Sequence, residues 1–317
     1  MADKIDLRGT PSRADQAFRG LAMGAACLVL LVLALIAIQM SGRMGPVFDR
    51  MGFSYFTSKR WSPAEGLFGA LPFLWGTLYT ACIAIVLSVP VSLFVALFVT
   101  QVASPRWRKP IVYVLDLLAV VPSVVYGLWG VLVLAQPLQK IFLKIHNAVD
   151  GIPGLQSIFG PTPQGRSFMT AGVILAIMIT PIITSLAREV IETTPQNEKE
   201  AAYALGATRW EMIRASVWPH SKSGLVGAVM LGLGRAMGET IAAALVIGSS
   251  IGQITINAFA PGNSMPAVIA NEWGEANDLR KSAMIALALL LFAITIIVNL
   301  VSSAIVQRSL RRSRGAL

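Results

Sequence analysis

Two ionisable residues, Arg235 and Glu239, lie in a stretch that is otherwise apolar and rich in glycine, from Gly224 to Gly248. A charged side chain inside a membrane span is costly, so such residues usually serve a function or pair with each other. The planar guanidinium group of arginine offers forked donors that suit the oxygens of an anion. Because residues four apart share one face of a helix, we expect Glu239 beside Arg235. The two are interpreted as an anion pathway, with a purely structural ion pair as the alternative.

A second region, residues 193–223, is polar and is expected to form an elbow of two short helices outside the membrane. Thr194 followed by Pro195 predicts the start of the first helix, with threonine as the N-cap. Gly206 predicts its end, because glycine accepts the left-handed conformation found after a helix. The small side chains of Ala201 and Ala202, next to Glu200, would let another protein approach the backbone closely.

The second helix of the elbow is predicted from a capping box. Thr208 and Glu211 have the required three-residue spacing, and Pro219 is expected to end the helix. An elbow of this kind could also lie on the lipid surface as an amphipathic segment, and the residue pattern alone leaves that alternative open.

The elements around these two regions are long apolar runs. The chain is 55% hydrophobic and only 13% charged, with a mean hydropathy of +0.67. A helix needs about 20 mostly apolar residues to cross the hydrocarbon core. Six runs meet this length: Gly20–Met40, Leu71–Ala103, Ile111–Gln136, Ser167–Ala187, Gly224–Gly248 and Ala283–Val306. The sequence therefore predicts an all-α, polytopic membrane protein with six transmembrane helices, in which prolines such as Pro122 make some helices irregular.

The distribution of positive charge predicts the topology. If the N-terminus is cytosolic, 16 of the 26 Lys and Arg residues fall on the cytosolic side and 9 outside, and Arg235 is the remaining one. This bias predicts that both termini face the cytosol, and it explains the net charge of +10 without a nucleic-acid partner. We expect a cytosolic tail (1–19), a membrane domain (20–306) and a basic tail (307–317). The first run is too long for a signal-peptide core and is expected to be retained.

No catalytic or nucleotide-binding motif accompanies these spans. The sequence has no P-loop pattern, no Gly-x-Ser-x-Gly, no His-Glu-x-x-His and no Cys-x-x-Cys. Cys27 and Cys82 are isolated and lie within spans, so they indicate no metal site. We expect a protein that is not an enzyme and that binds no cofactor. Uphill work would need energy from a partner subunit or from an ion gradient.

The polar elbow resembles the "EAA" loop of ABC importer permeases. That family pattern is Glu-Ala-Ala-x-x-x-Gly, then nine residues, then Ile-x-Leu-Pro. Here Glu200, Ala201, Ala202, Gly206 and Pro219 match, while Val217 and Trp218 stand beside the proline. Four further stretches are similar to the PstC-type permeases of phosphate importers: Phe68–Leu78, Pro122–Gly127, Gly232–Thr240 and Val268–Glu272.

The resemblance implies a type I importer permease. It implies a PstA-like second permease, a dimer of a PstB-like ATPase and a PstS-like phosphate-binding protein as partners, in a prokaryotic plasma membrane. The elbow would carry the coupling helix that meets the ATPase, and Arg235 with Glu239 would lie on the path of inorganic phosphate. A self-sufficient channel or ion-coupled carrier, and a membrane-embedded sensor or scaffold, are the alternative functions.

Overall fold

The computed structural model describes residues 13–160 and 163–314 of the chain. Nearly all of the ordered structure is helical, which confirms the predicted all-α class. The exception is a two-residue hairpin in which β1 (Trp61–Ser62) pairs antiparallel with β2 (Leu67–Phe68). The helices and helical segments follow in chain order: α1 (Arg13–Gly42), α2 (Gly45–Met51), α3 (Ser54–Thr57), α4 (Leu71–Leu97), η1 (Phe98–Val102), α5 (Pro105–Val120), α6 (Ser123–Trp129), η2 (Gly130–Leu134), α7 (Ala135–Val149), α8 (Leu155–Ile158), α9 (Phe168–Glu192), α10 (Gln196–Ala204), α11 (Arg209–Met212), η3 (Ile213–Val217), α12 (Trp218–Gly238), α13 (Ile241–Val246), α14 (Met265–Glu272), η4 (Trp273–Glu275) and α15 (Asp278–Arg314).

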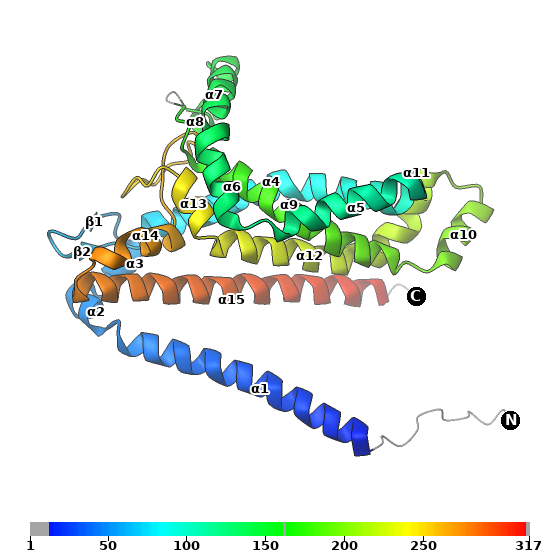
Figure 1. Cartoon of the computed structure of the whole chain (residues 1–317), viewed down its shortest axis with the longest axis horizontal. Coiled ribbons are helices and arrows are strands. Elements are labelled where there is room, and N and C mark those ends of the chain that lie inside the picture. Colours follow the sequence, from blue (N-terminus) through cyan, green and yellow to red (C-terminus); the bar gives the residue numbers. More distant parts are fainter. Residues whose placement is uncertain (1–12, 161–162, 315–317) are drawn as a thin grey trace.

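Helices α4, α5, α9, α12 and α15 run along the long axis of the molecule and form its bundle (Figure 1). The far end of α15 and the start of α1 lie at the same end of the bundle as α10. At the opposite end, α2, α3, the hairpin and α14 gather around the start of α15. Helix α1 tilts away from the bundle, and none of its apolar window is buried within the chain.

Five helical stretches of the described chain are long and apolar enough to cross a membrane, one fewer than the six predicted. They are Ala14–Gly42, Leu71–Val102, Ser123–Val149, Phe168–Glu192 and Asp278–Val301. The predicted run Gly224–Gly248 is missing from this set. It is split between α12, which begins in the polar stretch Trp218–Ser223, and the short helix α13.

The predicted third run, Ile111–Gln136, is not one continuous helix, and its break lies at Pro122, where an irregular helix was expected. Helix α5 ends at Val120, and Val121 adopts an extended conformation (φ −59°, ψ 127°) before Pro122. A residue that precedes proline is disfavoured in the helical region, which accounts for the break. The Tyr126 hydroxyl donates to the Leu118 carbonyl oxygen at 2.9 Å and so holds the two pieces across it.

The segment beyond this break departs further from the prediction. Helices α6 and α7 are joined through the π-helical segment η2, and α7 points away from the bundle axis (Figure 1). The chain therefore stays helical beyond the end of the predicted third run, as far as Val149. The turn-rich part of that segment starts only after Val149.

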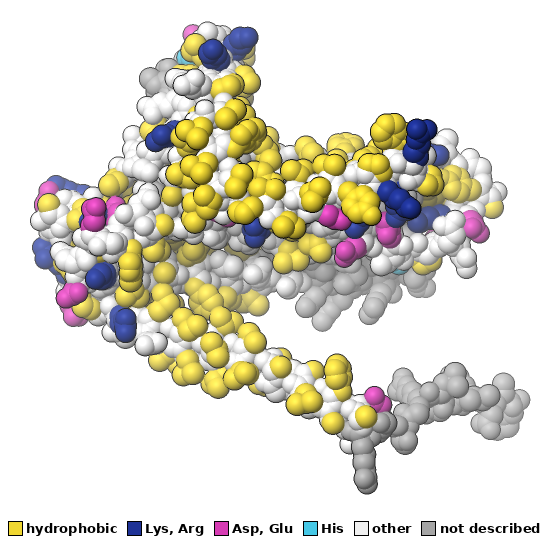
Figure 2. Space-filling view, in the orientation of Figure 1, with side chains coloured by type: hydrophobic (Ala, Val, Ile, Leu, Met, Phe, Trp, Pro, Cys, Tyr) yellow, Lys and Arg dark blue, Asp and Glu magenta, His cyan; other side chains and the backbone are white. Residues whose placement is uncertain are grey.

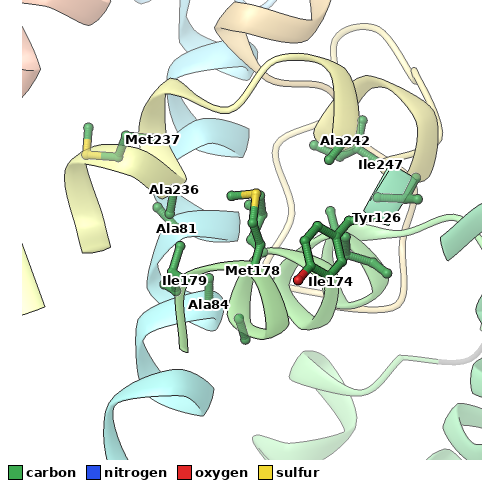
Figure 3. Close-up of a cluster of buried hydrophobic side chains, with 14 of the residues drawn as sticks. Ala81, Ala84, Tyr126, Ile174, Met178, Ile179, Ala236, Met237, Ala242 and Ile247 are labelled. Atoms are coloured by element: carbon green, nitrogen blue, oxygen red, sulfur yellow. The ribbon is translucent and has the colours of Figure 1, made fainter. Parts of the chain in front are cut away.

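Helix α9 forms the centre of the bundle, with buried residues along most of its length. Figure 3 shows Ile174, Met178 and Ile179 of α9 among alanines from α4 and α12 and side chains from α6 and α13. Glycine and alanine alternate at four-residue spacing on the face of α12 that packs against α9, at Gly224, Ala228, Gly232 and Ala236. Small residues at this spacing let two helices approach closely, which accounts for the packing of α12 against α9.

The end of the molecule opposite α10 is held together by polar contacts among aromatic side chains. The buried Tyr55 hydroxyl donates to the carbonyl oxygen of Ala283 at 2.7 Å, and burial raises the pKa of Tyr55. Glu272 accepts a hydrogen bond from the Trp61 indole at 3.1 Å and pairs with Arg280 at 2.6 Å. These contacts join the hairpin and α3 to α14 and to the start of α15.

Candidate functional site

Arg235 lines a cavity of about 570 Å³ between α9, α12 and α15. Its guanidinium group is exposed in the single chain and lies in the last turn of α12. Among the side chains that the structure describes, Asn299 of α15 is the one other polar group of the cavity, whose described lining consists of Ile182, Leu186, Gly227, Met230, Leu231, Gly234, Arg235 and Asn299. An apolar cavity with one cation and one amide can hold and orient a small anion.

The position of Arg235 at the end of a helix explains how its charge is stabilised. The last four carbonyl groups of a helix lack partners within it, and the helix dipole favours a cation there by about 0.3–1 kcal/mol. Among the described residues, the ion pairs are Arg60–Glu65, Arg108–Glu192 and Arg280–Glu272, and none includes Arg235. The guanidinium group is therefore free to bind an anion that enters the cavity.

Glu239 does not pair with Arg235 in this structure, contrary to the expected geometry. Helix α12 ends at Gly238, and Glu239 is extended (φ −70°, ψ 124°), so the two residues no longer share a helix face. Its carboxylate instead accepts a hydrogen bond from the backbone N–H of Ala242 at 3.2 Å, in the first turn of α13. The helix break thus separates the two charges, because it leaves Arg235 at the end of α12 and turns Glu239 toward the first turn of α13.

Of the residues that line the cavity, only Arg235 was predicted as a site residue; Asn299, Gly227 and Gly234 are among those that were not. A Cβ atom at either glycine would meet no atom within 4 Å, so these glycines open the cavity rather than pack against a neighbouring helix. Asn299 is a lone amide in the predicted sixth run, and a polar residue inside a membrane span is itself a functional signal. The proximity of Asn299 to Arg235 could not be read from the sequence.

The predicted elbow lies at one end of the bundle, where α10 protrudes (Figure 1). Its first helix begins at Gln196, and Thr194 is not the N-cap, which corrects the prediction. The Thr194 side chain is instead buried, with its Oγ1 atom 3.4 Å from the Oγ atom of Ser221. Gly206 ends this helix as predicted, since its φ of +83° lies in the left-handed region that glycine accepts.

The surface of α10 is mostly exposed. Glu200 and Ala201 are exposed, and the Glu200 carboxylate accepts a hydrogen bond from Gln196 at 3.1 Å. Ala202 is half-buried against the cluster that contains Met212 and Ile213. Helix α10 therefore rests on the bundle through one side and leaves the other side free.

The predicted capping box is confirmed at the start of α11. The Thr208 hydroxyl accepts from the Glu211 backbone N–H, and the Glu211 carboxylate accepts from the Thr208 backbone N–H at 2.8 Å. The hydrogen bonds from Thr208 lower the pKa of Glu211. Pro219 does not end this helix, which corrects the prediction. The helical path continues from Arg209 through η3 into α12, and Pro219 is the second residue of α12, directly after the π-helical segment.

Comparison with known families assigns the chain to a class of membrane transporters. Residues 65–311 match the family described as the inner membrane component of binding-protein-dependent transport systems, and the chain belongs to that family. It is therefore a multi-pass inner-membrane permease subunit of an importer, in which a partner subunit hydrolyses ATP. Within this class, the chain groups with the permeases named PstC, as its relatives show.

A protein of Mesorhizobium japonicum named phosphate transport system permease protein PstC is 41% identical over 296 residues, which cover 93% of this chain and 90% of that protein. The PstC of Haemophilus influenzae is 41% identical over 292 residues, 92% of each chain. A probable phosphate transport system permease protein PstC of Methanocaldococcus jannaschii is 32% identical over 271 residues, 83% of this chain and 84% of that one.

Two solved transporters share the fold. A chain of a bacterial alginate ABC transporter, in complex with its alginate-bound periplasmic protein, matches with a TM-score of 0.59 at 16% identity over 92% of this chain and 96% of that one. A chain of the MetNI methionine ABC transporter, in an inward-facing conformation, matches with a TM-score of 0.54 at 16% identity over 76% of this chain and 94% of that one. Both confirm the permease fold.

Proposed function

We propose that this chain forms half of the path by which inorganic phosphate is imported, coupled to a separate ATPase. The names of the PstC relatives support phosphate as the cargo. The single observation that carries the proposal is the cavity beside Arg235, where an unpaired guanidinium group and the Asn299 amide face apolar walls. This arrangement suits a small oxyanion, because guanidinium donors match phosphate oxygens and an amide adds donors without further charge.

In this proposal Arg235 binds the anion directly, and Glu239 is a positioning residue. By accepting the Ala242 N–H, Glu239 holds the first turn of α13 and maintains the break that leaves Arg235 at a helix end. The negative charge of Glu239 also lowers the affinity of Arg235 for phosphate, so that the anion is released rather than trapped.

The partners follow from the class. We propose a PstA-like second permease that completes the path and a PstB-like ATPase dimer that receives the elbow. A PstS-like binding protein would deliver phosphate at the opposite end. The exposed residues Glu200, Ala201 and Gly206 of the elbow would contact the ATPase. Ala202 and Pro219 would hold the elbow against the bundle. The elbow and both chain ends would then face the cytosol of a prokaryotic cell, with the spans in its plasma membrane.

The test replaces Arg235 with glutamine, which keeps the shape and polarity but removes the charge. The variant complex, with its partner subunits in vesicles, should assemble and hydrolyse ATP but lose phosphate uptake. Loss of charge-assisted hydrogen bonds worth about 1.5–3 kcal/mol lowers anion affinity roughly ten- to a hundredfold. Arg43→Gln is the matched control, because Arg43 is an exposed arginine after α1 and away from the cavity.

Two results would count against the proposal. Full uptake by Arg235→Gln would remove the anion role of the cavity. Phosphate uptake by the chain alone, without ATP or partner subunits, would favour a self-sufficient channel or carrier instead.

A further inference from the structure

A second cavity lies where the start of α5 packs against α9, apart from the one beside Arg235. Its volume is about 580 Å³. We call it the basic cavity, and it is lined by Ala103, Pro105, Arg108, Lys109, Val112, Tyr113 and Arg188. On the face shown in Figure 2, Lys and Arg side chains lie among hydrophobic ones at the end of the bundle where α5 begins, with Asp and Glu side chains beside them.

Two of the three cations that line the basic cavity have no ion-pair partner among the described residues. Arg108 pairs with Glu192, but neither Lys109 nor Arg188 belongs to an ion pair of the described chain. The Nε atom of Arg188 is buried and has no hydrogen-bond acceptor. Because nearly all buried donors in proteins are satisfied, this one indicates an acceptor that the chain itself does not provide.

The position of the basic cavity marks the boundary of the apolar layer. The candidate span that contains α4 ends at Val102, and the chain reverses at Ser104 before α5 begins. A cluster of cations at such a boundary meets the phosphate groups of lipids rather than their acyl chains.

An exposed, mostly apolar stripe continues from the basic cavity along α5, and the exposed carboxylate of Asp116 interrupts it. Tyr113 lines the cavity, and Leu117 and Val120 follow it at spacings of four and three residues on the same face. These side chains are 69%, 70% and 82% exposed, and no residue of α5 is buried. A cationic cavity that leads onto a mostly apolar helix face matches a molecule with an anionic head and hydrocarbon tails.

We propose that the basic cavity binds the phosphate group of an anionic phospholipid, whose acyl chains lie along the stripe of Tyr113, Leu117 and Val120. Arg188 and Lys109 contact the phosphate oxygens, and the buried Nε atom of Arg188 gains its missing acceptor. A free phosphate ion could make the same contacts as the lipid head group, but it has no acyl chains to contact the stripe. This site is separate from the cavity of Arg235 and does not depend on the identity of the cargo.

The test measures lipid binding to the full chain in an uncharged detergent. Dioleoyl phosphatidylglycerol is titrated in, and bound lipid is counted by native mass spectrometry, with dioleoyl phosphatidylcholine as the zwitterionic comparison. Arg188→Gln and Lys109→Gln should each weaken phosphatidylglycerol binding about fivefold, as expected for one cation near a membrane surface. Arg106→Gln is the matched control, because Arg106 is exposed in the same segment but does not line the cavity, and it should change binding less than twofold.

Competition separates the two possible sources of the phosphate group. Millimolar inorganic phosphate and glycerophosphoglycerol, the head group without acyl chains, should fail to displace the lipid. Displacement by inorganic phosphate would overturn the lipid assignment in favour of a free-anion site. An equal loss of binding in Arg106→Gln would overturn it in favour of general surface attraction. If Arg188→Gln fails to fold, the exposed Lys109 provides the deciding variant.

Discussion

Two glycines of α12 have different surroundings, and this difference predicts that the same substitution changes stability differently at the two positions. A Cβ atom at Gly232 would lie 2.5 Å from the Cδ1 atom and 2.6 Å from the Cγ1 atom of Ile183, which is fully buried in α9. A Cβ atom at Gly227 would meet nothing within 4 Å. Gly227→Ala is therefore a matched control for Gly232→Ala, on the same helix and with the same change of one methyl group.

The magnitudes follow from two competing effects. Alanine is favoured over glycine inside a helix by about 0.8–1 kcal/mol, and both variants gain this. Gly232→Ala also forces an extra methyl group into a packed core, which costs about 1–3 kcal/mol. Gly227→Ala should therefore be stabilised by roughly 1 kcal/mol, while Gly232→Ala should range from unchanged to destabilised by about 2 kcal/mol.

Thermal unfolding of the purified chain in detergent, followed by tryptophan fluorescence, would measure the order of the variants. We expect a lower melting temperature for Gly232→Ala than for Gly227→Ala. In an Ile183→Ala background the clash disappears, and Gly232→Ala should then raise the melting temperature, as coupling between contacting residues requires. If Gly232→Ala stabilises the original protein as much as Gly227→Ala does, the contact of α12 with Ile183 of α9 imposes no energetic cost on the added methyl group. That result would refute the prediction.

Two further predictions concern the elbow and the topology. Gly206→Leu should leave the chain inserted in the membrane but uncouple ATP hydrolysis from phosphate uptake. A φ of +83° costs residues other than glycine about 1–2 kcal/mol. Gly206→Asn should have a smaller effect, because asparagine tolerates this backbone region. Open space surrounds Gly206, so the effect would be one of backbone conformation, and normal coupled uptake by Gly206→Leu would refute it. The topology can be tested in a background that lacks Cys27 and Cys82, with single cysteines introduced for labelling. Cysteines at Ser12, Asn197 and Ser313 should react only with reagents on the cytosolic side, and a cysteine at Ser157 only with reagents outside. The reverse labelling would contradict the topology predicted from the positive charges.

Structural features that depend on neighbouring residues could be predicted from the sequence, whereas those that depend on contacts between distant residues could not. The capping box of Thr208 and the left-handed Gly206 depend on neighbouring residues and were predicted correctly. Proline was ambiguous, because Pro122 follows a helix break whereas Pro90 and Pro181 lie inside continuous helices. Both sides of each break are apolar, so hydropathy continues across it while the helix does not.

The candidate site was predicted only in part for the same reason. Arg235 was conspicuous as a charge in an apolar run, but its surroundings depend on which helices lie beside α12. The pairing expected with Glu239 assumed an unbroken helix, and the break after Gly238 removed that geometry. Asn299 is distant in sequence and reaches the same cavity only because α15 packs along α12.

The hydrogen bond from Tyr55 to Ala283 joins residues that are 228 positions apart in the chain. At synthesis rates of about 5–20 residues per second, roughly 10–50 seconds separate the appearance of the two partners. During that interval the Tyr55 hydroxyl can hydrogen-bond only to other partners, such as water. The aromatic side chains around it cannot yet pack against the start of α15. This end of the molecule is therefore among the last parts to close, and assembly of the subunit waits for its final helix.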